Sequence, residues 1–140
     1  MLRLNGKTRQ ASEPDAEAPP APRILVVDDS AFTRYNLKAM LSSNGYDVVD
    51  APDGETAVGV YAASQPDAVL LDITMPGMDG LDTLRSIRQL NPQARVAMVT
   101  GLGQQTIVLE AIKSGAADFI VKPFQPDRVL AALQKLLAAK

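Results

Sequence analysis

Short apolar runs alternate with amphipathic stretches from residue 23 to the end of this chain of 140 residues. This alternation is typical of βα units, in which the runs form the strands of a parallel sheet and the other stretches form helices that cover it. Five such units fit the sequence. It therefore predicts an α/β domain over residues 23–140, doubly wound around a five-stranded parallel sheet.

The expected elements can be placed from the apolar runs and from the residues that break them. We expect strands near residues 23–27, 46–50, 67–71, 95–99 and 118–121. We expect helices near residues 31–43, 54–63, 80–89, 104–113 and 126–138. Gly45 and Gly115 suit helix ends, because glycine readily adopts the left-handed conformation found there.

Three aspartates close two of the apolar runs. Asp28 and Asp29 follow the run 24–27, and Asp72 follows the run 68–71. The carboxyl ends of parallel strands lie along one edge of a sheet, so we expect these acids to share one pocket. Their like charges raise the pKa of one another's carboxyl groups unless a cation neutralises them. Because the ligands on offer are oxygen atoms, the cluster points to Mg²⁺.

Two further polar residues close apolar runs. Thr100 follows the run 96–99, and Lys122 follows the run 119–121. The same edge of the sheet therefore gains a hydroxyl and an ammonium group. A carboxylate nucleophile, a metal site, a hydroxyl donor and a cation are the parts needed to transfer a phosphoryl group, whose oxygens must be neutralised during the transfer.

Each of these residues also has a simpler role. An aspartate such as Asp72 at a strand end often forms a turn, and Asp29 or Ser30 can cap the helix expected from residue 31. Thr100 suits a strand because it is β-branched, and a lysine such as Lys122 is usually only solvated. The argument for a site depends on all of them occurring together.

The order and spacing of Asp28-Asp29, Asp72, Thr100 and Lys122-Pro123 resemble the receiver domain of two-component response regulators. The connecting segments 75–80 and 115–119 extend the resemblance, which covers the chain from about residue 23 onward. It implies a flavodoxin-like (βα)5 fold. It also implies a stand-alone response regulator in phosphorelay signal transduction, since the chain is too short to add a usual output domain.

The resemblance assigns a phosphoacceptor and a metal site. Asp72 accepts the phosphoryl group, because a carboxylate can attack an activated phosphorus and form an acyl phosphate. Mg²⁺ is held by Asp28, Asp29 and Asp72 and by the backbone carbonyl of Thr74. The sequence leaves open which of Asp28 and Asp29 binds the metal directly and which acts through water.

The resemblance also implies a conformational switch. Thr100 donates its hydroxyl to a phosphoryl oxygen, and Lys122, aimed inward by a cis peptide to Pro123, pairs first with Asp72 and then with the phosphoryl group. Phe119 is the aromatic switch residue that moves inward as Thr100 shifts, and its simpler role is core packing. Switching is then a population shift between two packing arrangements.

A partner surface is expected beside the switch. The helix over 104–113 has more apolar residues than one buried stripe requires, so part of this surface should remain exposed. These residues are Ile107, Val108, Leu109, Ala111 and Ile112. They form either a partner-binding patch or scattered surface residues of the kind that most proteins have.

The resemblance names two kinds of partner. A histidine kinase donates the phosphoryl group, and a downstream protein binds the face formed by 104–113, 118–121 and 126–138. Within the family, segments 103–105 and 122–126 resemble stand-alone chemotaxis regulators, whose partner is the flagellar motor switch. A receiver working in another phosphorelay is the alternative.

Two other classes of protein share part of this pattern. Aspartyl-nucleophile phosphohydrolases also use a strand-end aspartate, Mg²⁺, a threonine and a lysine, but they carry an acid where this chain has Thr74. We therefore expect a switch with slow self-phosphorylation and dephosphorylation and no enzymatic turnover. A scaffold that is never phosphorylated is the third class, and the presence of every expected site residue argues against it.

The composition excludes several functions. Without cysteine there are no disulfides and no thiol catalysis, and without histidine any phosphohistidine donor must be another protein. The net charge is −2 and the charges are interspersed, so we expect neither nucleic acid nor a membrane surface as a partner. No apolar run approaches the ~20 residues of a membrane span, and we expect a cytoplasmic monomer.

Residues 1–22 differ from the rest of the chain. They hold four of the ten prolines, balanced charges and few large apolar side chains, a composition that cannot form a core. We expect a flexible extension rich in proline and alanine. A tether or docking arm is the functional alternative, and no role is assigned to the segment.

Overall fold

Helices and strands alternate along the part of the chain that the computed structural model describes, which is residues 20–75, 77–101 and 105–138. The strands are β2 (Arg23–Val27), β3 (Asp47–Ala51), β4 (Ala68–Asp72), β5 (Val96–Thr100) and β6 (Asp118–Val121). The helices are α1 (Ala31–Ser43), α2 (Gly54–Ser64), α3 (Gly80–Leu90), α4 (Gln105–Lys113) and α5 (Pro126–Ala138). The predicted (βα)5 order is confirmed.

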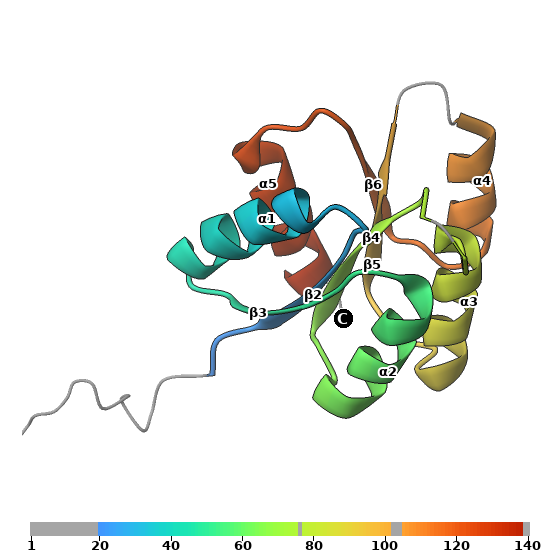
Figure 1. The fold of residues 1–140 in the computed structure, drawn as a ribbon, viewed down its shortest axis with the longest axis horizontal. Coiled ribbons are helices and arrows are strands. Elements are labelled where there is room, and N and C mark those ends of the chain that lie inside the picture. Colours follow the sequence, from blue (N-terminus) through green and yellow to red (C-terminus); the bar gives the residue numbers. More distant parts are fainter. Residues whose placement is uncertain (1–19, 76, 102–104, 139–140) are drawn as a thin grey trace, which may run out of the picture.

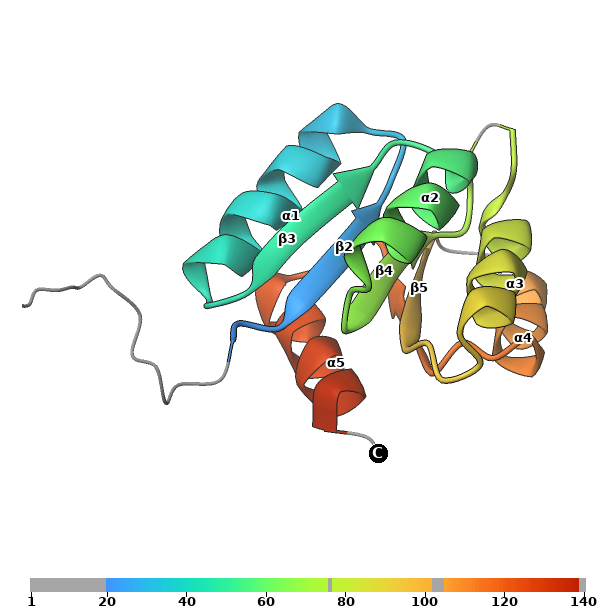
Figure 2. The ribbon, with the colours of Figure 1, turned by 90° about the horizontal axis from the view of Figure 1, so that it is seen from below.

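The strands form one parallel sheet in the order β3-β2-β4-β5-β6. Figure 2 shows β3, β2, β4 and β5 side by side in this order. The direction of winding reverses between β2 and β4, so the carboxyl ends of these two strands are neighbours. Open α/β sheets bind ligands at such a reversal. The topology therefore brings the end of β2 beside the end of β4.

Helices cover both faces of the sheet (Figure 1). Helices α1 and α5 pack on one face, which we call the α1/α5 face, through residues such as Leu41 and Leu133. Helices α2, α3 and α4 pack on the other, which we call the α2–α4 face, through residues such as Ala57, Leu84 and Ala111. The core is thus two apolar layers separated by the sheet.

Side chains of each strand alternate between these two layers. In β2, Ile24 and Val26 belong to the α1/α5 layer, whereas Leu25 and Val27 belong to the α2–α4 layer. Because both faces are buried, β2 is apolar at every residue from Ile24 to Val27 and not only at every second residue. This explains why the strands read as continuous apolar runs in the sequence.

The predicted boundaries that fall within the described residues agree with the structure to within one residue, while the predicted helix start at residue 104 lies outside them. Strands β3, β4 and β5 each begin and end one residue later than predicted, so that Asp72 and Thr100 are the last residues of their strands. Gly45 and Gly115 follow helices with φ of 91° and 108°, the left-handed conformation predicted for them. None of the helices within the described residues is long and apolar enough to cross a membrane.

Candidate functional site

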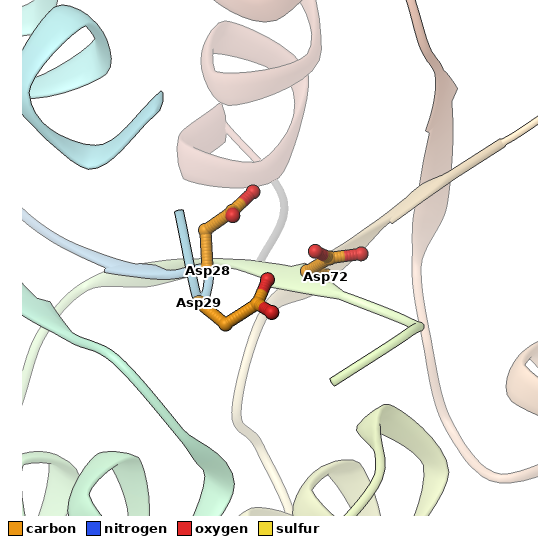
Figure 3. Close-up of side chains that lie close together, drawn as sticks. All are labelled: Asp28, Asp29 and Asp72. Carbon is orange, nitrogen blue, oxygen red and sulfur yellow. The ribbon is translucent and has the colours of Figure 1, made fainter. Parts of the chain in front are cut away.

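Three carboxyl groups gather at the ends of β2 and β4 (Figure 3). Asp28, Asp29 and Asp72 each offer one carboxylate oxygen, and these oxygens lie within 4.8 Å of one another. Asp28 and Asp72 are only 3% and 6% exposed, whereas Asp29 is exposed to solvent. The cluster therefore has a buried floor and an open side at Asp29.

The turn after β2 holds Asp28 by its backbone and its side chain. The Asp28 N–H donates to the Ala51 carbonyl at 3.2 Å, which extends the pairing of β2 with β3 by one residue. The Asp28 carboxylate accepts from the Ser30 N–H at 2.9 Å. Ser30 caps α1, because its hydroxyl accepts from the Thr33 N–H at 3.1 Å. Since Ser30 is the cap, Asp29 does not fill that role.

Asp72 is a buried carboxyl group with an altered pKa. Burial raises its pKa and the nearby charge of Asp28 adds to this, while a hydrogen bond from the Thr74 N–H at 3.1 Å and the charge of Lys122 oppose it. The net pKa of Asp72 is above its ordinary value. A carboxyl group buried among like charges in this way is typical of a functional site.

Lys122 joins two of the three acids. Its Nζ lies 3.2 Å from Asp28 Oδ2 and 3.4 Å from Asp72 Oδ2. Partial burial acts to lower the pKa of Lys122, but the charges of Asp72 and Asp28 outweigh it, so the pKa of this ammonium group is raised. The contact with Asp28 was not predicted from the sequence. The peptide between Lys122 and Pro123 is cis, as the family resemblance implied.

The remaining predicted site residues, Thr100, Thr74 and Phe119, differ in their burial and contacts. Thr100 is buried at the end of β5, next to β4, and its hydroxyl donates to the Gly101 carbonyl at 3.1 Å. Thr74 is exposed, with its N–H on the Asp72 carboxylate. Phe119 lies near the start of β6 and is 37% exposed, so the structure has its ring in an outward position.

A groove opens beside the cluster on the α1/α5 face. It has a volume of about 490 Å³ and runs between α1 and the segment after β6. Its lining includes Phe32, Leu37, Met40, Lys122, Pro123 and Phe124. The groove is mostly apolar, and Lys122 is where it meets the acidic cluster.

The acidic cluster has the donors that Mg²⁺ prefers. Its ligand atoms are carboxylate oxygens, and three carboxylates face one ammonium group, so negative charge is in excess. Mg²⁺ usually binds through one or two carboxylates, with water and substrate oxygens completing its coordination. Two buried acids and one acid open to solvent fit this pattern.

A parallel five-stranded sheet with an acidic cluster and a lysine at its carboxyl edge defines a class of phosphoacceptor domain. The chain belongs to the response regulator receiver domain family, whose profile it matches over residues 24–134. It is 52% identical over 118 residues to the chemotaxis protein CheY of Bacillus subtilis (strain 168), a match that covers 84% of this chain and 98% of that protein. It is 49% identical over 115 residues to CheY of Thermotoga maritima, covering 81% and 96% respectively.

Solved structures share the fold. The CheX-CheY-BeF3-Mg²⁺ complex of Borrelia burgdorferi aligns with a TM-score of 0.79 and 39% identity, covering 84% of this chain and 90% of the matched chain. The receiver domain of NtrX from Brucella abortus aligns with a TM-score of 0.80 and 35% identity, covering 84% and 99%. The chain is therefore a CheY-like response regulator receiver domain.

Proposed function

We propose that this chain is a stand-alone response regulator that accepts a phosphoryl group on Asp72 and signals through binding of a partner protein. The observation that carries the proposal is the position of Asp72. Its carboxylate is buried at a strand end, faces two other acids and contacts the Lys122 ammonium group. A structural aspartate at a turn does not require this surrounding set of charges.

Asp72 supplies the nucleophile. One of its carboxylate oxygens attacks the phosphorus atom of the donor, the bond from phosphorus to the donor breaks, and an acyl phosphate forms on Asp72. The attacking carboxyl group must be ionised, and contact with Lys122 favours that form. The donor is another protein or a small phosphorylated molecule, because this chain has no histidine.

Other groups of the site neutralise or bind the negatively charged phosphoryl oxygens. Asp28, Asp29 and Asp72, with the Thr74 carbonyl, would hold Mg²⁺, which when bound neutralises these acids and the phosphoryl oxygens. The Lys122 ammonium group moves from the Asp72 carboxylate to a phosphoryl oxygen. The Thr100 hydroxyl, which donates to the Gly101 carbonyl in the structure, turns toward a second phosphoryl oxygen.

Exposed apolar side chains on α4 and β6 support a partner surface on that side of the molecule. Leu109 and Ile112 of α4 are 61% and 48% exposed, so the predicted exposure of part of this helix is confirmed. Phe119 and Val121 of β6 are exposed as well. Movement of Thr100 and Phe119 would change this surface, and the downstream partner would bind the changed form.

The relatives favour a role in chemotaxis. Two CheY proteins are about half identical to this chain over nearly their whole length. On this basis the phosphodonor is a histidine kinase and the target is the flagellar motor switch. The likeness to the NtrX receiver domain supports a second candidate, a receiver domain in another phosphorelay.

The test is phosphorylation of the purified chain with acetyl phosphate and Mg²⁺, followed by intact-mass spectrometry. We expect one added phosphoryl group on the wild type, and none on Asp72→Asn or when Mg²⁺ is removed by chelation. Asp82→Asn is the matched control, because Asp82 is an exposed residue of α3, and it should be phosphorylated like the wild type. An adduct that survives in Asp72→Asn, or that forms equally without Mg²⁺, would overturn the proposal.

A further inference from the structure

One arginine connects the acidic cluster to a neighbouring strand. Arg34 lies in the first turn of α1, and its side chain is 18% exposed. Its Nε donates to Asp50 Oδ2 of β3 at 3.0 Å, and its Nη1 donates to the backbone carbonyl of Asp28 at 2.8 Å. The guanidinium group therefore binds β3 and the turn after β2 at the same time.

The contact with Asp28 fixes a peptide plane. The Asp28 carbonyl belongs to the same planar unit as the nitrogen and Cα of Asp29. A hydrogen bond that holds this carbonyl therefore sets the direction in which Asp29 leaves the turn. The N–H of Asp28 is held on its other side by the Ala51 carbonyl, so rotation of the turn is restricted at both ends of Asp28.

The position of the Asp29 carboxylate depends on this backbone more than the positions of the Asp28 and Asp72 carboxylates do. Asp28 and Asp72 are buried, and their carboxylates are held by Lys122 and by backbone N–H groups. Asp29 is exposed, and among the described residues its carboxylate takes part in no hydrogen bond or ion pair. Its place in the cluster is thus set by the direction of its backbone.

We propose that Arg34 is a positioning residue for the metal site, which it organises through the Asp28 carbonyl without touching the metal. This inference rests on the proposed function, since it assumes that the acidic cluster binds Mg²⁺. The role requires arginine because two N–H groups of one rigid plane must reach acceptors on two different segments, whereas a lysine offers a single ammonium group. Asp50 completes the device by holding the guanidinium group in place.

A second arginine provides a matched control for a purely structural role. Arg23 donates from Nε to Asp47 Oδ2 of β3 at 2.7 Å and from Nη1 to the Ser64 carbonyl at 2.9 Å. Like Arg34, it therefore binds one carboxylate of β3 and one backbone carbonyl of another segment, here the last residue of α2. Arg23 and Asp47 begin their strands, however, so this pair lies at the opposite edge of the sheet from the acidic cluster.

The experiment is a calorimetric titration of the full chain with Mg²⁺, which measures the dissociation constant directly and needs no phosphorylation. We expect Arg34→Met to weaken Mg²⁺ binding by ~10-fold or more, as loss of partners that orient metal ligands commonly does. Arg34→Lys should restore only part of the affinity. Arg23→Met should bind Mg²⁺ like the wild type even if its unfolding midpoint falls.

Asp50→Ala tests the same interaction by removing the carboxylate that holds the Arg34 guanidinium group. It should weaken Mg²⁺ binding in the same direction, and the double variant with Arg34→Met should be no weaker than Arg34→Met alone, because both changes act through one guanidinium group. If Arg34→Met does not fold, Asp50→Ala and Arg34→Lys decide the question, since the first leaves α1 unchanged and the second keeps a positive charge at residue 34.

Two results would overturn the inference while leaving the proposed function intact. One is wild-type Mg²⁺ affinity in every folded variant of Arg34 and Asp50. The other is an equal loss of affinity in Arg23→Met, which would make the effect one of general stability. A wild-type chain that binds no Mg²⁺ would contradict the metal site itself and the inference with it.

Discussion

At the scale of single residues, the site is governed by the balance of charge around Asp72. Lys122 contacts both Asp28 and Asp72, so one ammonium group serves two carboxylates. Burial and the charge of Asp28 still leave the pKa of Asp72 raised. Without a metal, the ionised form of Asp72 therefore destabilises the fold.

This balance predicts a pH-dependent effect of Asp72→Asn in the absence of metal. A carboxyl group with a raised pKa binds its proton more tightly in the folded state, so the wild type loses stability as pH rises from 3.8 through the raised pKa. The asparagine variant lacks this loss. We expect it to unfold at a higher temperature than the wild type at pH 7, with the difference disappearing below pH 3.8, as measured by thermal unfolding in EDTA.

Addition of Mg²⁺ serves as the control for this prediction. It should remove the advantage of Asp72→Asn, because the wild type then gains stability from metal binding that the variant has lost. A variant that is less stable than the wild type at pH 7 in EDTA would contradict the argument.

Most of the candidate site could be predicted from strand ends. The rule that parallel strands end along one edge was enough to group Asp28, Asp29 and Asp72. The contact of Lys122 with Asp28 could have been predicted from the alternation of side chains along the strands. Alternation places Lys122 on the same face as Ile120 and Asp28 on the same face as Val26, and both Ile120 and Val26 belong to the α1/α5 layer. Arg34 could not be predicted, because its contacts depend on how α1 is turned against the sheet.

At the scale of elements, the fold could be predicted from the sequence because the burial of each element determines its pattern of apolar residues. The central strands β2, β4 and β5 are buried on both faces and the helices on one, so their apolar patterns differ in length and period. The one-residue shift of β4 and β5 has a physical cause. Asp72 and Thr100 are polar, but they still pair with Val99 and Val121 on the next strand, and backbone pairing is invisible to a hydrophobic pattern.

The junction of β4 with α3 gives a prediction at this scale. A Cβ at Gly80 would lie 2.6 Å from both the Asp72 carbonyl oxygen and the Ile73 Cα, and backbone atoms cannot move away as a flexible side chain can. We expect Gly80→Ala to destabilise the fold by about 1–3 kcal/mol, measured by urea unfolding. It should also slow phosphorylation by acetyl phosphate, because α3 is forced away from Asp72.

Gly59→Ala is the control for the substitution itself. Gly59 lies within α2, and a Cβ there meets nothing within 4 Å. The same change of glycine to alanine should therefore stabilise the fold by about 0.5–1 kcal/mol through helix propensity. Equal effects at both glycines would show that contact with the Asp72 backbone is not the cause.

At the scale of the whole molecule, the proposed metal site would link Mg²⁺ binding to folding. Its three acids lie in the turn after β2 and at the end of β4, which are brought together only in the folded chain. We therefore expect Mg²⁺ at 100 times its dissociation constant to raise the free energy of unfolding by about 2.7 kcal/mol. Thermal unfolding with increasing Mg²⁺ measures this effect.

Substitution of Asp29 separates metal binding from general stability. Asp29 is exposed, so Asp29→Ala should leave the metal-free midpoint nearly unchanged while reducing the shift caused by Mg²⁺. A thermal midpoint that stays constant from zero to saturating Mg²⁺ in the wild type would count against the metal site.

The alternation of side chains between two layers has a further consequence for the order in which two partner proteins can bind. The groove beside Lys122 and the exposed apolar residues of α4 and β6 share no residue, and they lie on different sides of the sheet. A protein bound over α1 and another bound over α4 and β6 do not compete for the same atoms. If the phosphodonor binds over the groove, a target can therefore be captured at α4 and β6 before the phosphodonor has departed.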